Sequence, residues 1–221
     1  MSSVSPPVRS RSEDDGPVRR TVPYYSQWES PELVGDIIAR RIAAEDDPEW
    51  RRSGAESPEE YAFWSWRTCG MACLRMALHH WQGGTPPMME LARDYLAAGA
   101  YVLRPDGGLD GLIYAPFAAR TRERFGLQAL ARPDLPPQEV RDQLAAGRLV
   151  MLSVHPSVRT PDAEPPRRGG HLVLAVDCSR ESVVLHNPSG LHGESQKYAE
   201  VPWRKFTRFY AGRGIVLGAH G

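Results

Sequence analysis

The sequence has few cysteines, no excess of either charge and no long apolar run. Three cysteines in 221 residues are too few for the disulfide framework of a small secreted domain, and an odd number leaves at least one free thiol. No run approaches the 18 or more apolar residues of a membrane span. The first residues hold no apolar stretch of signal-peptide length, so we expect a cytoplasmic location.

The balance of charge also excludes classes of partner. The chain has 27 Lys and Arg against 27 Asp and Glu, a formal net charge of zero. Such a chain lacks the broad positive field that non-specific nucleic-acid binding needs, so we expect neither a nucleic acid nor a membrane as partner. Hydrophobic residues make up 41%, which is enough for a core at this length. The oligomeric state is not specified.

The pattern of the chain divides it into an arm and one folded part. Residues 1–20 are rich in Ser, Pro, Arg and acidic residues, which predicts a disordered arm, with residues 21–221 as a single domain. Helical spacing comes first and short aliphatic runs come later, which predicts an α+β fold. We expect an extended or strand segment at 22–28, a turn-rich stretch at 47–60, helices at 30–45, 69–81, 87–98, 109–125 and 137–146, and strands at 149–154, 171–177, 182–187 and 214–219.

A long loop separates two of the expected strands. Residues 155–170 contain four prolines, and loops of this length in compact domains are usually lids or disordered segments. Its arginines, Arg159, Arg167 and Arg168, could attract an acidic substrate, although a solvated lid is the interpretation we prefer.

Cys69 stands where a helix is expected to begin. The positive end of the helix dipole favours thiolate over thiol, and thiolate is the nucleophilic form. The unpaired N–H groups of the first turn could also stabilise an oxyanion that develops beside the sulfur. Position alone favours a small buried residue, because buried, inert cysteines are common. Cys73, inside the helix, and Cys178, at the end of an aliphatic strand, are expected in the core.

A thiolate nucleophile needs a base and a group that orients the base. His171 follows Gly169-Gly170 and opens the strand 171–177, so it can reach a cleft. If the turn to the next strand centres on Arg180, His171 lies opposite Ser189 with Asn187 as its diagonal neighbour, within side-chain reach. Asn187 is therefore the better orienter, and Asp177 is the alternative near the opposite end of the hairpin.

Several motifs together resemble a known family. Cys-Gly-x-Ala-x-x-x-Met-x-Leu (69–78), Gly-His-Leu-Val-Leu-Ala-Val (170–176) and Leu-His-Asn-Pro-Ser-Gly (185–190) look like those of C39 and C39-like cysteine peptidases. The segments 22–27 and 201–206 are similar to that family's N-terminal segment and its late Trp/Phe helix. The resemblance implies a papain-like fold in which an N-terminal helical half carrying the nucleophile packs on a C-terminal antiparallel sheet.

The resemblance also implies roles for individual residues. Cys69 would be the nucleophile, His171 the base, Asn187 the orienter and Gln27 the side-chain donor of an oxyanion hole. Trp66, Arg159 and Arg168 are expected to contact the substrate. The chain departs from the family in carrying Met71 instead of proline, Asn187 where Asp is more frequent, and 42 positions from Gln27 to Cys69. The long gap leaves open a surface position for Gln27, with Ser65 or Thr68 nearer the nucleophile.

Four functions are compatible with these residues. The favoured hypothesis is a cofactor-independent thiol hydrolase, a peptidase or amidase that forms an acyl-enzyme on a peptide or small acyl substrate. An acyltransferase or cyclase would use the same residues. A papain-like module that only binds a peptide is the second rival, and a metal site at His171, Asp177 and His186 is a distant third.

Overall fold

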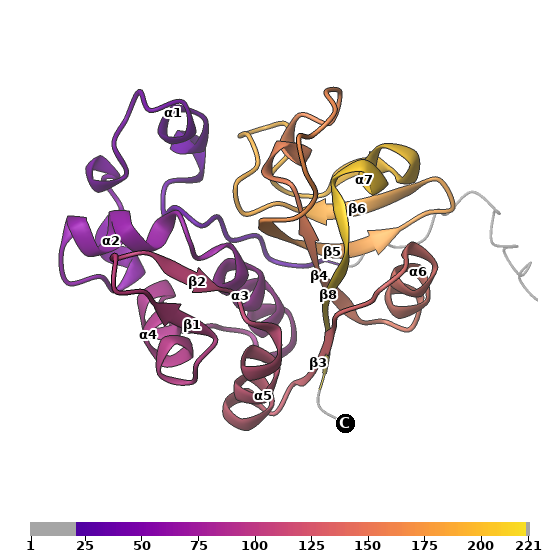
Figure 1. Ribbon diagram of the computed structural model, residues 1–221, viewed down its shortest axis with the longest axis horizontal. Coiled ribbons are helices and arrows are strands. Elements are labelled where there is room, and N and C mark those ends of the chain that lie inside the picture. The colour runs from indigo at the N-terminus through magenta and orange to yellow at the C-terminus, as the bar shows by residue number, and fades with distance from the viewer. Residues whose placement is uncertain (1–20, 220–221) are drawn as a thin grey trace, which may run out of the picture.

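The computed structural model describes residues 21–219 and places a helical half beside a sheet (Figure 1). The arm predicted for residues 1–20 lies outside the described residues. The helices of the first half are α1 (Val34–Ile38), α2 (Pro58–Ser65), α3 (Cys69–Gln82), α4 (Met88–Ala97) and α5 (Tyr114–Phe125), and the second half adds α6 (Pro137–Ala145) and α7 (Trp203–Phe209). The strands are β1 (Tyr101–Leu103), β2 (Leu109–Gly111), β3 (Gln128–Arg132), β4 (Leu149–Val154), β5 (His171–Cys178), β6 (Ser182–His186), β7 (Ala199–Pro202) and β8 (Tyr210–Gly218).

Six strands form one antiparallel sheet in the order β3-β8-β4-β5-β6-β7. The last strand of the chain, β8, therefore inserts between β3 and β4. The remaining two strands, β1 and β2, form a separate hairpin in the helical half. This order confirms the predicted mixture of an earlier helical part and a later antiparallel sheet.

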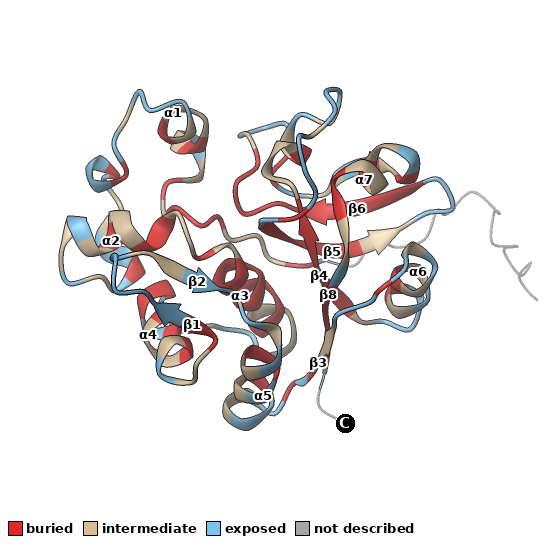
Figure 2. Cartoon of the chain, in the orientation of Figure 1, coloured by how far each residue is buried: buried red, intermediate tan, exposed pale blue. Residues whose placement is uncertain are grey.

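Both faces of the sheet are covered, which explains why its strands read as continuous aliphatic runs. Every residue of β4 is buried, and Figure 2 shows the central strands in the colour of buried residues. Met151 and Leu174 belong to the core shared with α3 and α4, whereas Val150 and Val173 belong to the core shared with α6 and α7. Alternate residues of a strand thus stabilise opposite layers.

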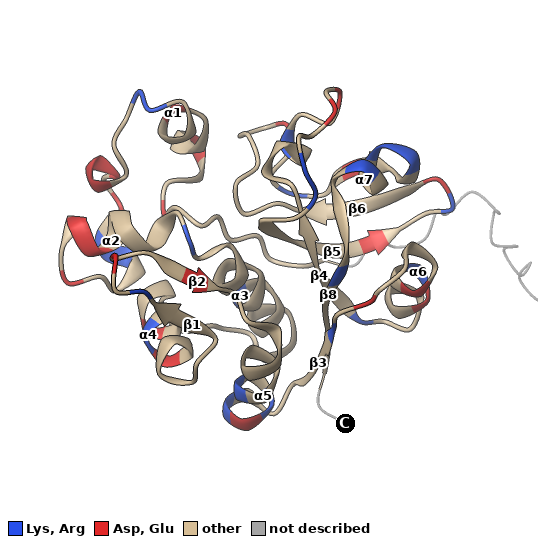
Figure 3. Cartoon of the chain, in the orientation of Figure 1, with Lys and Arg blue, Asp and Glu red and all other residues tan. Residues whose placement is uncertain are grey.

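Helix α3 is the centre of the helical half. Its span matches the predicted helix to within one residue, and it ends where Gly83 adopts a left-handed conformation, with φ 75°. Nine consecutive residues from Gly70 to Leu78 are buried, and the helix is drawn almost entirely in the colour of uncharged residues (Figure 3). A helix buried on nearly all sides positions its first residue rigidly.

Several predicted boundaries are wrong. The first helix is a 3₁₀ turn followed by α1, which ends at Ile38, and Arg40 has φ 59°. Ser30 is of a residue type that commonly caps helices, but here its hydroxyl donates instead to the buried carboxylate of Asp47. The predicted helix 109–125 begins only at Tyr114, since residues 109–111 pair as β2.

The polar stretch predicted as turns contains two further elements. It holds the 3₁₀ turn Trp50–Ser53 and the start of α2. Ser57 accepts a hydrogen bond from the Glu60 amide and Pro58 follows it, a start signal that we missed. The segment 22–28 belongs to no strand, and the chain bends at residues 27–29. Within residues 21–219 no helix is long and apolar enough to cross a membrane.

Candidate active site

Cys69 is the first residue of α3 and lies against the start of β5. Burial raises the pKa of its thiol above the ordinary value, while the backbone amides of Leu172, Gly70 and Cys69 itself act in the opposite direction. The same strand residue, Leu172, accepts from the Cys73 thiol through its carbonyl at 3.7 Å. The amide of Leu172 thus faces the Cys69 sulfur directly after His171 in the chain.

His171 is buried and held by Asn187. The His171 Nε2 atom lies 2.8 Å from Asn187 Oδ1. An amide oxygen only accepts, so Nε2 carries the proton and Nδ1 keeps a free lone pair. The backbone of Asn187 is itself fixed, because its N–H donates to the Gln196 carbonyl and its carbonyl accepts from the Tyr24 hydroxyl. The imidazole is therefore presented in one tautomer and one orientation.

The register of the β5–β6 hairpin produces this contact. Leu174 pairs with His186 and Ala175 with Leu185, the register predicted for a turn centred on Arg180. Nearer the turn the register shifts by one residue, with Asp177 opposite Val184. An irregularity in β5 absorbs the difference. Continued toward the open end, the register puts His171 opposite Ser189 and diagonal to Asn187.

A second hydrogen-bond partner of His171 connects it to the long loop. The Ser189 hydroxyl lies 3.1 Å from His171 Nε2, and it accepts from Arg159 Nη2 at 3.0 Å. The Ser189 amide also donates to Asn187 Oδ1 at 3.1 Å. Arg159 belongs to a 3₁₀ turn of the loop, Pro156–Arg159, and burial lowers the pKa of its guanidinium.

Gln27 bridges the two sides of the site. Its amide nitrogen donates to the Ser65 carbonyl at 2.9 Å, and its backbone N–H donates to the Pro188 carbonyl at 3.0 Å. It is only 5% exposed, so it is not a surface residue. Its Oε1 atom is buried without a hydrogen-bond partner, as is the Thr68 hydroxyl next to Cys69.

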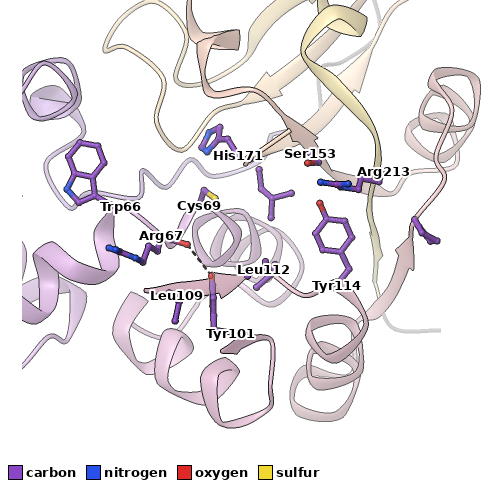
Figure 4. Close-up of a pocket in the computed structure, with 14 residues that line it drawn as sticks. Trp66, Arg67, Cys69, Tyr101, Leu109, Leu112, Tyr114, Ser153, His171 and Arg213 are labelled. Carbon is purple, nitrogen blue, oxygen red and sulfur yellow. Dashed lines mark hydrogen bonds between the residues drawn. The ribbon is translucent and has the colours of Figure 1, made fainter. Parts of the chain in front are cut away.

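Cys69 and His171 line a shared cavity of about 520 Å³ between the helical half and the sheet (Figure 4). Trp66 borders it as well, held in place by an edge contact with Trp28 at 5.0 Å and by the Arg40 guanidinium at 4.1 Å. The remaining lining residues are Arg67, Tyr101, Leu109, Gly111, Leu112, Tyr114, Pro133, Ser153, Gly170, Leu172 and Arg213.

The two loop arginines expected at the substrate are not among these residues. Arg159 lies behind the site on Ser189, where it borders a different and smaller cavity with Asn187. Arg168 is exposed. Sequence reasoning instead missed Ser153 and Arg213, although Ser153 is the one polar residue in the run 149–154 and that signal was available.

The protonation states follow from burial. Burial lowers the pKa of His171 to about 4, with smaller contributions in the same direction from the charges of Arg159 and His155, while the hydrogen bond to Asn187 opposes it. The Cys69 pKa is raised. At neutral pH the pair therefore rests as a neutral thiol and a neutral imidazole. A neutral imidazole is able to accept a proton.

The alternative orienter and the alternative metal set are not assembled. Asp177 lies six residues along β5 from His171, and its carboxylate accepts from the Cys178 amide. Across the described ranges, no group of three His, Cys, Asp or Glu side chains could hold a metal ion.

Solved structures show which known fold this arrangement shares. A C39-like peptidase from Bacillus anthracis is similar over 70% of this chain and 90% of its own, with a TM-score of 0.50 and 17% identity. The peptidase domain of Streptococcus ComA, a bifunctional ABC transporter of a quorum-sensing pathway, is similar over 70% of this chain and 93% of its own, with a TM-score of 0.48 and 12% identity. A double-glycine-motif protease from an AMS/PCAT transporter, solved in complex with the leader peptide, is similar over 68% of this chain and 84% of its own, with a TM-score of 0.44 and 15% identity.

No protein-family model matches the sequence, and neither does any curated protein. The likeness therefore concerns the fold. It agrees with the family that the three motifs resemble, since helix α3 carries Cys69 against an antiparallel sheet that carries His171. The chain has the papain-like α+β fold of the C39-like peptidases.

Proposed function

We propose that the protein is a thiol-dependent hydrolase that cleaves an amide bond of a peptide through Cys69, His171 and Asn187. One observation carries the proposal. The Nε2 atom of His171 is engaged by Asn187 at 2.8 Å, so its free Nδ1 is available in the cavity that also exposes Cys69. A nucleophile, a base and an orienter of the base are what covalent acyl transfer requires.

The chemistry follows from the neutral resting pair. As the substrate binds, Nδ1 of His171 takes the proton of the Cys69 thiol and the sulfur attacks the amide carbonyl. When the tetrahedral intermediate collapses, the C–N bond breaks, and the imidazolium gives its proton to the leaving amine. Water then loses a proton to His171 and attacks the thioester. The acid departs and the thiol regains its proton.

Two donors are proposed for the oxyanion. The backbone N–H of Cys69 lies in the first turn of α3, where amides have no partner within the helix. Gln27 is the second donor, because its amide nitrogen has one hydrogen left after bonding Ser65. Its bond to the Pro188 carbonyl ties it to the turn that follows Asn187. The unpartnered, buried Oε1 atom of Gln27 costs stability, and retention of such a group fits a functional position.

The test compares two cysteines in the same protein. Cys69→Ala should abolish cleavage of a fluorogenic peptide library, with the folded state checked by circular dichroism. Cys178→Ala is the matched control, because Cys178 is also partly exposed but lies at the far end of β5. Equal activity of wild type and Cys69→Ala would refute the assignment of Cys69 as the nucleophile.

A second measurement identifies the covalent step. A peptide aldehyde or iodoacetamide should modify Cys69 before Cys73, which is fully buried, and mass spectrometry of the digested protein locates the adduct. In water labelled with ¹⁸O the acid product should carry one label from the hydrolysis of the thioester. Incorporation of an added amine without the label would assign acyl transfer instead.

A further inference from the structure

Three polar side chains gather at one side of the active-site cavity. Tyr114 comes from α5, Ser153 from β4 and Arg213 from β8, and all three line the cavity with Cys69. Figure 4 shows the Tyr114 hydroxyl, the Ser153 hydroxyl and the Arg213 guanidinium close to one another. Within residues 21–219 none of these three side-chain groups makes a hydrogen bond or an ion pair.

The backbone of the loop leaves room beside this group. Gly169 has φ 77°, and a Cβ atom at this position would stand 3.1 Å from the Ser153 hydroxyl and 3.5 Å from the Arg213 guanidinium. Ser153 is only 3% exposed, so its hydroxyl is fixed by the sheet. Glycine at 169 therefore keeps open the space in which Ser153 and Arg213 face the cavity.

The charge of the cavity lining is positive. It contains two arginines and no Asp or Glu. Arg67 is already engaged, because it donates to the Phe63 carbonyl and lies 4.2 Å from the Phe63 ring. Arg213 has no such partner in the described part of the chain. It is also the one charged residue of β8, where it stands exposed at the mouth of the cavity.

We propose that Tyr114, Ser153 and Arg213 form a specificity subsite for a carboxylate of the substrate. This proposal rests on the proposed function. The Arg213 guanidinium would donate two hydrogen bonds to the carboxylate, and the two hydroxyls would donate to its remaining lone pairs. The positive charge of Arg213 complements the negative charge of a carboxylate. The carboxylate comes from an Asp or Glu side chain or from the end of a peptide chain.

The experiment measures substrate preference. Internally quenched peptides carry Asp or Glu, or the neutral Asn or Gln, at each position on both sides of the scissile bond, and short peptide acids are compared with their amides. Wild type should prefer the acidic member at one position, or the free acid, by about ten- to hundredfold in kcat/KM. Arg213→Gln should reduce that ratio to near one, and Arg213→Glu should bring it below one.

The control is Arg180→Gln, at the opposite end of the β5–β6 hairpin, which should keep the full ratio. Ser153→Ala should lower the ratio by less than Arg213→Gln. Cleavage by wild type without an acidic preference, or a ratio unchanged in Arg213→Gln, would overturn the subsite while leaving the hydrolase intact.

A binding measurement separates the two proposals. If wild type cleaves no peptide, the hydrolase fails. The subsite is then tested by fluorescence anisotropy of the same peptides on Cys69→Ala. Weaker binding of acidic peptides to the double variant Cys69→Ala/Arg213→Gln supports the subsite, and equal binding overturns it.

Discussion

The Nε2 atom of His171 and the Oδ1 atom of Asn187 lie 2.8 Å apart, across two strands whose register changes along their length. Because β5 takes up one extra residue between Ala175 and Asp177, the open end of the hairpin keeps the alignment that the bond needs. A one-residue slip would move every side chain beyond it to the other face. The irregularity in the strand is thus part of how the fold positions the His171 imidazole.

Asn187 is expected to act through the orientation of His171. Asn187→Ala removes the acceptor for Nε2, so the imidazole can rotate, and kcat/KM should fall by about 10²-fold. Asn187→Asp keeps the geometry and adds a negative charge, which favours the imidazolium and should raise the pKa of His171. The rate of Cys69 alkylation against pH measures both effects. An unchanged pH profile in Asn187→Asp would contradict the assigned contact.

Arg159 is expected to be a positioning residue rather than a substrate contact. Burial is the main cause of the low pKa of His171, and the charge of Arg159 adds to it. Arg159→Gln should therefore raise the pKa of His171. The acid limb of the pH profile of kcat/KM should then move to higher pH, with little change in KM. Ser189→Ala should produce a smaller shift, because it removes the hydrogen bond but leaves the charge.

The same pH profile separates this role from substrate binding. Arg180→Gln serves as the control and should leave the acid limb in place. A large increase in KM with an unmoved acid limb in Arg159→Gln would restore the substrate contact that the sequence suggested.

Gly190 should tolerate no side chain, because the backbone of Ser195 and Gln196 passes very close to it. A Cβ at Gly190 would stand 2.1 Å from the Ser195 carbonyl oxygen and 2.6 Å from the Gln196 amide nitrogen. These are backbone atoms, so Gly190→Ala should destabilise the protein by about 2–3 kcal/mol. It should also reduce activity, since the Gln196 carbonyl holds the Asn187 amide.

Gly84→Ala is the matched control for this prediction. A Cβ at Gly84 meets nothing within 4 Å, and its φ is not positive. Urea unfolding followed by fluorescence compares the two variants with wild type. Equal stability of Gly190→Ala and Gly84→Ala would show that the turn after Asn187 is not packed as described.

The elements around Cys69 were predictable because their signals are local. The apolar spacing of 69–81 and the Gly-Gly that ends it specify α3, and each aliphatic run bounded by turn residues specifies a strand. His171 and Asn187 then meet because a short turn joins their strands. The local sequence pattern and the register of one hairpin were sufficient to predict the positions of Cys69, His171 and Asn187 in the fold.

The rest of the site depends on pairing between distant segments. Ser153 and Arg213 come together only because β8 pairs with β4, with Met151 opposite Ile215, and the sequence order of the strands does not reveal that insertion. The failure at the first helix has a similar cause. Ser30 reads locally as a cap, but Asp47, 17 residues later, takes its hydroxyl. At Ser30 a tertiary contact thus overrode the local signal.

The stability of the protein should fall on acidification through two buried histidines. Burial lowers the pKa of His171 and of His186 to about 4, from 6.5 when unfolded. The His186 ring packs between Tyr24 at 5.7 Å and Tyr198 at 4.5 Å, and neither of its nitrogens has a hydrogen-bond partner. Between pH 6.5 and 4 the unfolded chain binds more protons than the folded one. The stabilisation is therefore complete above pH 6.5 and is lost as pH falls toward 4.

Each histidine should contribute about 3 kcal/mol to this loss. His186→Phe keeps an aromatic ring between the two tyrosines but cannot bind a proton, so its stability should depend less on pH than that of wild type. The measurement is the free energy of unfolding in urea at several values from pH 7.5 to 4.5. The carboxylates titrate in both proteins, so their contributions cancel in the difference. A difference that stays constant over this range would mean that His186 accepts a proton in the folded protein as readily as in the unfolded chain.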